Sequence, residues 1–468
     1  MQTVCRYGWT EGSRTKIKPG NIFYGWWIVA AGGAVQLYTS AVFWRGFAVF
    51  FGPIVETFGW SRGATAAAVS LQRVEGGMIS PFVGTLIDRY GPRKVMAFGV
   101  TMTGSGFIMM SFVQSLWQFY LAVIVLTVGM SFGTFIVFVV TVGNWFIRRR
   151  ARALAVLMST SAIGGITIPL LSASVDWFGW RQVIFAVGIG FWVVGFPAML
   201  AMRRRPEEYG MLPDGDAPST EGDVPGDPSA RHHRPQREAS ITAREALKMR
   251  FFWQLAIAAS LGQLVSSTNL LHVDALTDFG VGGILAASAV GVVAVGDLLG
   301  RVGVGIFGDR LNKRYLLAGA FSVQTLGVVA LPLVNAEVMG ISLGLLPLPV
   351  FVACFGLGFG ASIPLRLAIL ADYFGRRSYG SIVGITSTVS AGFAAAGPLF
   401  AGVMFDLTGT YRVAFLVLGA LLVTAVPMTI LLESQGRVAA QARRAIRRSR
   451  LGAGGSASAM EQEPPLQH

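Results

Sequence analysis

The stretch ILAASAVGVVAVGDLLGRVGVGIFGDRLNKR, residues 284–314, places two opposite charges inside a long apolar segment that ends in a basic turn. The charges are Asp297 and Arg301, four residues apart, which in an α-helix puts both side chains on one face about 6 Å apart along the axis. A charge at mid-bilayer depth costs about 2.5 to 3.5 kcal/mol on insertion scales, so it is usually paired or functional. The stretch predicts a membrane helix whose ion pair either serves a coupled anion carrier or is structural.

The composition supports a membrane protein. The chain has 468 residues, of which 53% are hydrophobic and 13% charged, whereas soluble domains carry about 25% charged residues. A formal net charge of +14 would indicate nucleic-acid binding in a soluble protein. Here 31 of the 38 Lys and Arg fall in alternate connections and the two termini, which is the positive-inside pattern. The basic charge therefore indicates orientation in the membrane, and no nucleic-acid partner is expected.

Apolar runs long enough to cross a bilayer of about 30 Å occur twelve times, since a spanning helix needs about 20 residues. They cover residues 22–51, 63–87, 94–114, 118–146, 152–175, 181–202, 251–277, 282–307, 315–335, 341–373, 380–405 and 411–432. Every second connection is basic, so both termini are expected in the cytoplasm. The chain is expected in the plasma membrane, or in the cell inner membrane of a bacterium.

Five regions are predicted along the chain: a cytoplasmic tail at 1–21, a six-helix bundle at 22–202, a flexible cytoplasmic linker at 203–250, a second six-helix bundle at 251–432 and a cytoplasmic tail at 433–468. The linker is rich in Pro, Gly, Asp and Ser, a composition that cannot bury a core. The first 20 residues lack the apolar region and cleavage site of a signal peptide, so the first helix is expected to insert uncleaved.

The two bundles repeat each other in sequence. GTLIDRYGPRK at 84–94 corresponds to GIFGDRLNKR at 305–314 with an offset of 221, and two further matches follow in the same order at offsets of 228 and 230. Such matches indicate internal duplication. Parallel repeats related by an axis along the membrane normal place a substrate site between the halves near the midplane.

The motif GTLIDRYGPRK resembles the signature between helices 2 and 3 of the major facilitator superfamily, and GIFGDRLNKR resembles its degenerate second copy. Other stretches are similar to the monocarboxylate porter and oxalate:formate antiporter branch: GWWIV, VFWRGFAVFF, WFIRRRARALA, NLLHVDALTDFG and ADYFGRRSYGSIVG. The resemblance implies an all-α integral membrane fold, with twelve transmembrane helices in two pseudo-symmetric bundles. It also implies a secondary transporter working by alternating access, which is not an enzyme.

The resemblance also implies roles for three charged residues. Arg301 is similar in position to the helix 8 arginine that engages the substrate carboxylate, and Asp297 to the acidic residue associated with proton coupling. Arg45 takes the place of a helix 1 lysine that takes part in coupling in some members. Helix 7 lacks the proline that follows its histidine in many bacterial members. Helix 11 has no lysine, which disfavours a dicarboxylate held between cations on helices 8 and 11.

Other charges inside apolar segments have two interpretations each. Arg366 is either a second substrate cation or a charge at the inner rim of the bilayer. Arg45 either faces the cavity or extends to the outer interface. His272 titrates near neutral pH and is either a proton-coupling residue or a hydrogen-bonded wall residue with Asp274 as its partner.

Gating is predicted at the two copies of the motif, because their carboxylates can cap a helix or pair with a basic group across the inner mouth. The candidates are Asp88, Arg89 and Arg93 in the first copy and Asp309, Arg310 and Arg314 in the second. Carriers of many substrates share these residues, so they carry no information on specificity.

The sequence predicts a secondary active transporter of a small organic anion, with a monocarboxylate as substrate and a proton as coupling ion. A carboxylate exchanger is the nearest alternative, and an exporter of other small molecules is more distant. No Walker sequence, metal cluster or catalytic triad occurs in a plausible context, so no cofactor or metal is expected. The expected partners are the anion, the proton and the lipid bilayer, with one chain as the transport unit.

Overall fold

The computed structural model describes residues 22–44, 46–60, 62–216, 241–338 and 341–432. This part of the chain is almost entirely helical, apart from a short hairpin of β1 (Glu337–Val338) and β2 (Ile341–Ser342). The hairpin takes up the start of the run predicted as helix at 341–373, and the helix itself begins at Pro347.

The first half contains six membrane segments, three of them interrupted. The elements are α1 (Tyr24–Thr39), η1 (Ser40–Trp44), α2 (Phe47–Phe58), α3 (Arg62–Tyr90), α4 (Pro92–Ser111), α5 (Leu116–Gly133), α6 (Phe135–Trp145), α7 (Arg150–Ile163), η2 (Gly164–Thr167), α8 (Ile168–Phe178) and α9 (Trp180–Ala201). A π-helical turn, η1, joins α1 to α2, and Thr134 separates α5 from α6 with a non-helical backbone.

The second half also contains six segments within the described residues. The elements are α11 (Arg250–Ser266), η6 (Ser267–Leu271), α12 (His272–Asp278), α13 (Gly283–Phe307), α14 (Lys313–Ala330), η7 (Leu331–Leu333), α15 (Pro347–Phe374), α16 (Tyr379–Thr408) and α17 (Arg412–Ile430). The two sets of six confirm the predicted all-α fold of two bundles.

Nine stretches of the described chain are long and apolar enough to span a membrane by composition alone. The three segments outside this group are α3, α4 and the one that starts with α11. They are nevertheless packed inside the bundles, since α3 contacts α5 and α16, α4 contacts α5 and α9, and α11 contacts α16 and α17. Packing against neighbouring helices, rather than composition, therefore identifies these three as spans.

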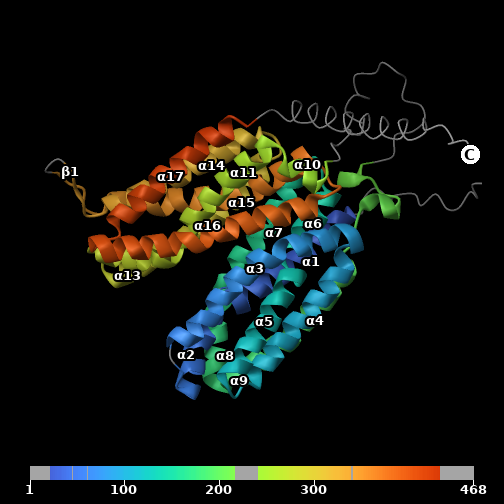
Figure 1. Ribbon diagram of the computed structural model, residues 1–468, viewed down its shortest axis with the longest axis horizontal. Helices are drawn as coiled ribbons and strands as arrows, with labels where there is room; N and C mark the ends of the chain where they lie inside the picture. Colours follow the sequence, from blue (N-terminus) through green and yellow to red (C-terminus); the bar gives the residue numbers. More distant parts are fainter. Residues whose placement is uncertain (1–21, 45, 61, 217–240, 339–340, 433–468) are drawn as a thin grey trace, which may run out of the picture.

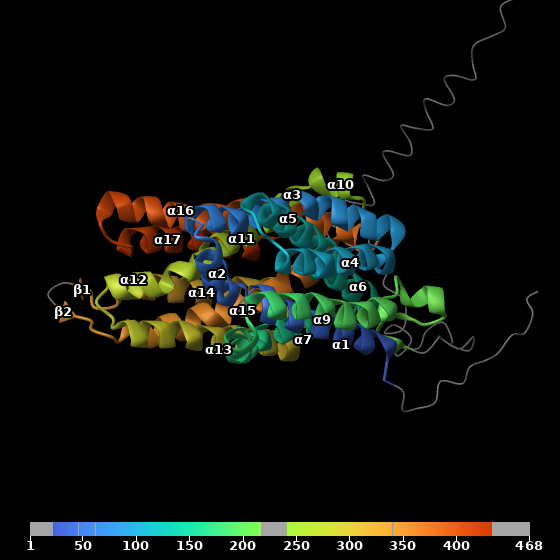
Figure 2. The same cartoon turned by 90° about the horizontal axis from the view of Figure 1, so that it is seen from below.

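The two halves meet at one end and diverge toward the other. Figure 1 shows them side by side near α10 and separated at the end that carries α2 and α8 in one half and β1 in the other. Figure 2 shows the same elongated molecule from below, with most helices running along its length. Contacts between the halves are made by α3 with α16 and by α7 with α13. A Cβ atom added at Gly84 would lie 2.0 Å from the carbonyl oxygen of Gly380, so the backbones of α3 and α16 touch there.

The connection between the halves is more ordered than the sequence predicted. Within 203–250, the structure describes η3 (Pro206–Tyr209), η4 (Pro213–Gly215) and α10 (Ala243–Leu247). The buried Asp214 carboxylate accepts hydrogen bonds from three successive backbone N–H groups, those of residues 147 to 149, at 2.8 to 3.1 Å. The expectation of a flexible linker is therefore wrong for 203–216, because hydrogen bonds hold a polar segment that could not bury a core. Residues 217–240 and both predicted tails lie outside the described chain.

Candidate functional site

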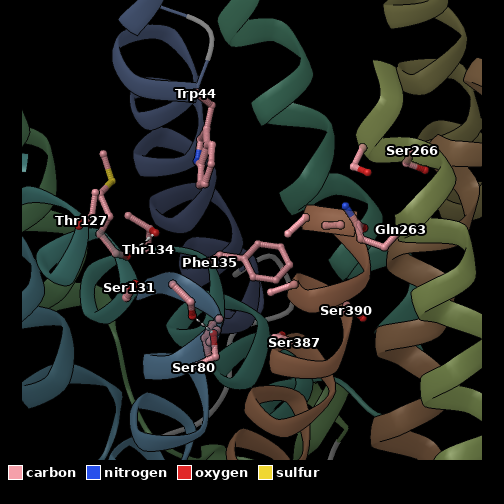
Figure 3. Close-up of a pocket in the computed structure, with 18 of the residues that line it drawn as sticks. Trp44, Ser80, Thr127, Ser131, Thr134, Phe135, Gln263, Ser266, Ser387 and Ser390 are labelled. Atoms are coloured by element: carbon pink, nitrogen blue, oxygen red, sulfur yellow. Dashed lines mark hydrogen bonds between the residues drawn. The ribbon is translucent and has the colours of Figure 1, made fainter. Parts of the chain in front are cut away.

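A cavity of about 450 Å³ lies between the two halves (Figure 3). Elements α3, α5 and α6 form its wall in the first half, and α11, η6, α15 and α16 form its wall in the second. Most of the polar lining groups are neutral: Ser80, Thr127, Ser131 and Thr134 from the first half, and Gln263, Ser266, Ser267, Asn269, Ser387 and Ser390 from the second. The aromatic rings of Trp44, Phe135 and Phe359 complete the wall.

Arg366 on α15 is the one charged residue in the described lining of this cavity. Its side chain is half-buried, and it has no hydrogen bond or ion pair with any residue that the structure describes. A guanidinium that is removed from bulk water without a carboxylate partner favours an anion in the cavity. Of the two interpretations of Arg366, this position fits a substrate cation.

Asp297 and Arg301 form the ion pair predicted from their spacing. Arg301 Nε and Nη2 donate to the two carboxylate oxygens of Asp297, each at 2.8 Å, and the two residues are only 7% and 4% exposed. The third guanidinium nitrogen, Nη1, donates to the carbonyl oxygen of Met158 and to Ser161 Oγ on α7, the latter at 2.9 Å. The pair therefore ties α13 of the second half to α7 of the first, and it lies outside the lining of the central cavity.

The helices that carry the pair and Arg366 are in direct contact. A Cβ atom added at Gly360 would lie 2.0 Å from the carbonyl oxygen of Asp297, so the backbones of α15 and α13 pack without an intervening side chain. Small residues allow such close backbone contact between membrane helices.

The repeat places Gly76 and Ser80 at the positions equivalent to Asp297 and Arg301, at the offset of 221 seen in the sequence. Ser80 Oγ donates to the carbonyl oxygen of Gly76 at 2.6 Å, a neutral bond between residues four apart. Both residues line the cavity. The first half thus presents a neutral surface where the second half carries its ion pair.

Glu75 on α3 lies directly behind this surface. The hydroxyl of Thr127 donates to Glu75 Oε2, whereas Oε1 is buried and has no partner among the described residues. The side chain of Arg73, two residues away, lies outside the described atoms, as does the whole of Arg45. The structure therefore gives no position for the candidate cation of helix 1.

His272 lies apart from the cavity, at the start of α12. Its side chain is 1% exposed and its ring packs against Phe351, Phe355 and Phe415 with centroid separations of 4.7 to 5.7 Å. Nδ1 has no hydrogen-bond partner among the described residues. Asp274, the expected partner, is exposed and makes no hydrogen bond to it. The predicted hydrogen bond to Asp274 is therefore wrong, and aromatic rings surround His272 away from the cavity.

At the end where the halves meet, each half supplies an aspartate to a helix start of the other. Asp88 accepts from the backbone N–H groups of Gly380 and Ser381, at 3.2 and 2.9 Å, and from Ser381 Oγ at 2.8 Å, at the start of α16. Asp309 accepts from the N–H groups of Ala151 and Arg152, at 2.9 and 3.0 Å, at the start of α7. A carboxylate at a helix N-terminus satisfies unpaired donors and the helix dipole.

A cluster of charges surrounds the second of these contacts. Asp372 at the end of α15 pairs with Arg150 and with Lys313, each at 2.6 Å, and Arg150 is 1% exposed. Burial raises the pKa of Asp309, while the N–H group of Arg152 and the charge of Lys313 act in the opposite direction. Sequence analysis did not assign Asp372 and Lys313 to the gate. The sequence signal for Asp372 is its place at a helix end beside a basic connection. Lys313 belongs to another basic connection.

The remaining gating candidates do not join the halves in the described structure. Arg89, Arg93 and Arg310 are exposed. Arg314 donates to the carbonyl oxygen of Leu432 and to Tyr315 Oη, both within the second half. Among the predicted gating residues that the structure describes, the two aspartates are the ones that bond to the opposite half.

Comparison with known proteins identifies the family. The model of the Major Facilitator Superfamily matches residues 34–391, which is most of the chain. The chain belongs to the Major Facilitator Superfamily. Two relatives are monocarboxylate transporter 2 of Mus musculus, 25% identical with 84% of this chain and 81% of the relative covered, and monocarboxylate transporter 11 of Homo sapiens, 27% identical with 86% and 81% covered.

Solved structures of the Major Facilitator Superfamily have the same fold. A bacterial homologue of the iron transporter ferroportin in an outward-facing state superposes with a TM-score of 0.65 at 16% identity, over 87% of this chain and 99% of that one. The chain is therefore a multi-pass membrane protein and a secondary transporter rather than an enzyme. Its two relatives are named monocarboxylate transporters, the branch of the superfamily that its sequence motifs resemble.

Proposed function

We propose that this Major Facilitator Superfamily member carries a small monocarboxylate together with a proton by alternating access. The observation that supports the anionic substrate is Arg366, a cation without a described partner in a cavity whose other described lining groups are neutral. The relatives named monocarboxylate transporters agree with this charge preference. A drug exporter for cations would be expected to carry an acidic group at this position.

The proposed coupling depends on the charge of the buried pair. In the empty carrier Asp297 neutralises Arg301. When a substrate carboxylate binds Arg366, the adjoining helix α13 shifts, and Asp297 is released from Arg301 and takes up a proton. The loaded site then has the same net charge as the empty one. Since moving an uncompensated charge through a low-dielectric barrier is costly, the loaded and empty carriers change state and the half-loaded carrier does not.

The proposed gate is the end at which Asp88 and Asp309 cap helices of the opposite half. The basic connections of the sequence support a cytoplasmic location for this end and for both termini. When these two caps break, the cavity opens to the cytoplasm. When they form, access from the cytoplasm is blocked, so the caps select between the two access states.

The test is uptake of radiolabelled monocarboxylates, including lactate, pyruvate and formate, into proteoliposomes with and without an inward proton gradient. Uptake stimulated by the gradient in the wild type, and lost in Arg301→Gln, is the expected result. Arg244→Gln, which changes an exposed arginine on α10, is the matched control and should keep full uptake. Uptake that requires internal carboxylate, with oxalate included as substrate, would replace the proton by a second anion and identify an exchanger. If no carboxylate accumulates, the proposal is wrong.

A further inference from the structure

We infer that the central cavity selects a monocarboxylate that carries hydroxyl or amide groups along its body, rather than a three-carbon or purely aliphatic acid. This inference rests on the proposed function and specifies the substrate class of the same site. It follows from the size of the cavity, from the polar groups that remain unused in its wall and from the presence of Arg366 in the same lining.

The cavity is large for a short acid. Its volume of about 450 Å³ lies within the range of roughly 300 to 1,000 Å³ that encloses ligands of drug size. An acid of three carbons bound at Arg366 would leave most of this space to water. A longer body would occupy more of the space between the polar walls.

Four neutral side chains in the wall have no hydrogen-bond partner in the described chain. They are Ser131 on α5, Gln263 on α11, Asn269 on η6 and Ser387 on α16. Other lining hydroxyls are already engaged: Ser390 pairs with Ser260 at 3.1 Å, and Ser266 donates to its own helix and accepts from Gln324. The four unused groups therefore provide amide and hydroxyl contacts that a ligand can satisfy.

These groups lie on both sides of the cavity. Figure 3 shows Ser131 on the first half facing Gln263 and Ser387 on the second, with the Phe135 ring between them. A ligand whose carboxylate lies at Arg366 can hence place further polar groups against either half. A site built to hydrogen-bond a substrate strongly rejects an analogue without those groups, because its own donors and acceptors are then left unpaired. The same arrangement therefore disfavours an aliphatic acid of equal length.

The test compares probes that share one carboxylate and differ in body. Gluconate has six carbons and five hydroxyls, pantothenate has hydroxyls and an amide, hexanoate has six carbons and no further polar group, and lactate is short. With an inward proton gradient, kcat/KM for gluconate or pantothenate is expected to exceed that for hexanoate and for lactate by at least about tenfold. Preference for lactate or hexanoate would overturn the inference and leave the proposed function intact.

Variants of two cavity-lining residues test whether their side chains provide this selectivity for polar acids. Gln263→Ala and Ser387→Ala should each raise KM for the preferred polar probe by about tenfold and leave KM for hexanoate within about twofold. Ser322→Ala is the matched control, since this serine donates to its own helix on α14 and does not line the cavity. A size-exclusion profile like that of the wild type shows that a variant is folded. If folded variants keep the wild-type KM for the polar probe, the site assignment is wrong. If no carboxylate responds to the gradient, the proposed function itself fails.

Discussion

Arg301 and Arg366 are both guanidinium groups within membrane segments, but their surroundings give them different roles. Arg301 is held by a carboxylate and by two oxygens of the opposite half, whereas Arg366 faces a cavity without a described partner. The spacing in the sequence predicted the first environment, because residues four apart share a helix face. No spacing could predict the second, since the groups that line the cavity come from eight different elements.

Substitution of Arg366 tests whether the cavity binds the substrate carboxylate. Arg366→Gln is expected to raise KM for uptake by roughly 10- to 100-fold, because a hydrogen bond to a charged group contributes about 1.5 to 3 kcal/mol. Arg366→Lys keeps the charge but loses the planar fork, so an intermediate KM is expected. The measurement is initial uptake into proteoliposomes. Equal KM for wild type and Arg366→Gln would show that the carboxylate binds elsewhere.

The ion pair can be tested for a structural role separately. Asp297→Asn leaves Arg301 buried without a counter-charge and is expected to lower stability by about 3 to 5 kcal/mol, while the double variant Asp297→Asn with Arg301→Gln recovers much of it. Thermal unfolding in detergent measures this difference. Proton-driven uptake should remain absent in the double variant. If that variant still accumulates substrate with the gradient, the pair is structural only.

At the closed end of the molecule, the two halves are joined at the N-termini of α7 and α16. Sequence analysis identified both aspartates of the repeated motif, but their partners are backbone N–H groups, which no sequence pattern specifies. The sequence did not predict which polar residues line the cavity, for a related reason. A serine in a membrane helix can donate to its own backbone, as Ser80 does, or lack a described hydrogen-bond partner at the cavity, as Ser131 does. The residue type alone does not distinguish these two cases.

The two caps are expected to act independently, because they lie at separate crossings of helices. Asp88→Ala and Asp309→Ala should each destabilise the closed end by about 0.5 to 2 kcal/mol, the usual range for a lost helix cap. Their effects should add in the double variant. Distances between spin labels placed on the two halves report the shift toward the open state, with Arg244→Gln as an exposed control. A closed population that none of the variants changes would argue against a gating role.

For the whole molecule, duplication, span number and superfamily could all be inferred from periodicity and motifs, whereas the contacts of the connecting segment could not. Its composition predicts disorder, yet Glu207 forms an ion pair of 2.7 Å with Arg376 of the second half, and Asp214 binds the loop before α7. Local composition cannot specify such contacts, because they depend on donors supplied by distant helices. The covalent connection is therefore part of the packed structure where it leaves the first half.

Two substitutions separate the contributions of this segment. Asp214→Ala leaves three backbone N–H groups without their acceptor and is expected to lower stability by about 1 to 3 kcal/mol. Glu207→Gln removes the partly exposed ion pair with Arg376 and is expected to cost at most about 1 kcal/mol. Thermal unfolding of each purified variant gives the comparison, with Asp216→Asn as the exposed neighbour. Equal stability of Asp214→Ala and Asp216→Asn would show that the hydrogen bonds to Asp214 do not stabilise the protein.

The neutral bond between Ser80 and Gly76 has a consequence for the history of the chain. A duplicated unit begins as two identical copies, so equivalent positions that now differ have changed in at least one copy. Asp297 and Arg301 retain charge in one copy, and the other copy holds small residues in the same places. One repeat thus carries the buried ion pair, and the other carries a neutral cavity wall at the equivalent positions. New substrate preferences in descendants of this chain would be expected to arise first on the side of Gly76 and Ser80.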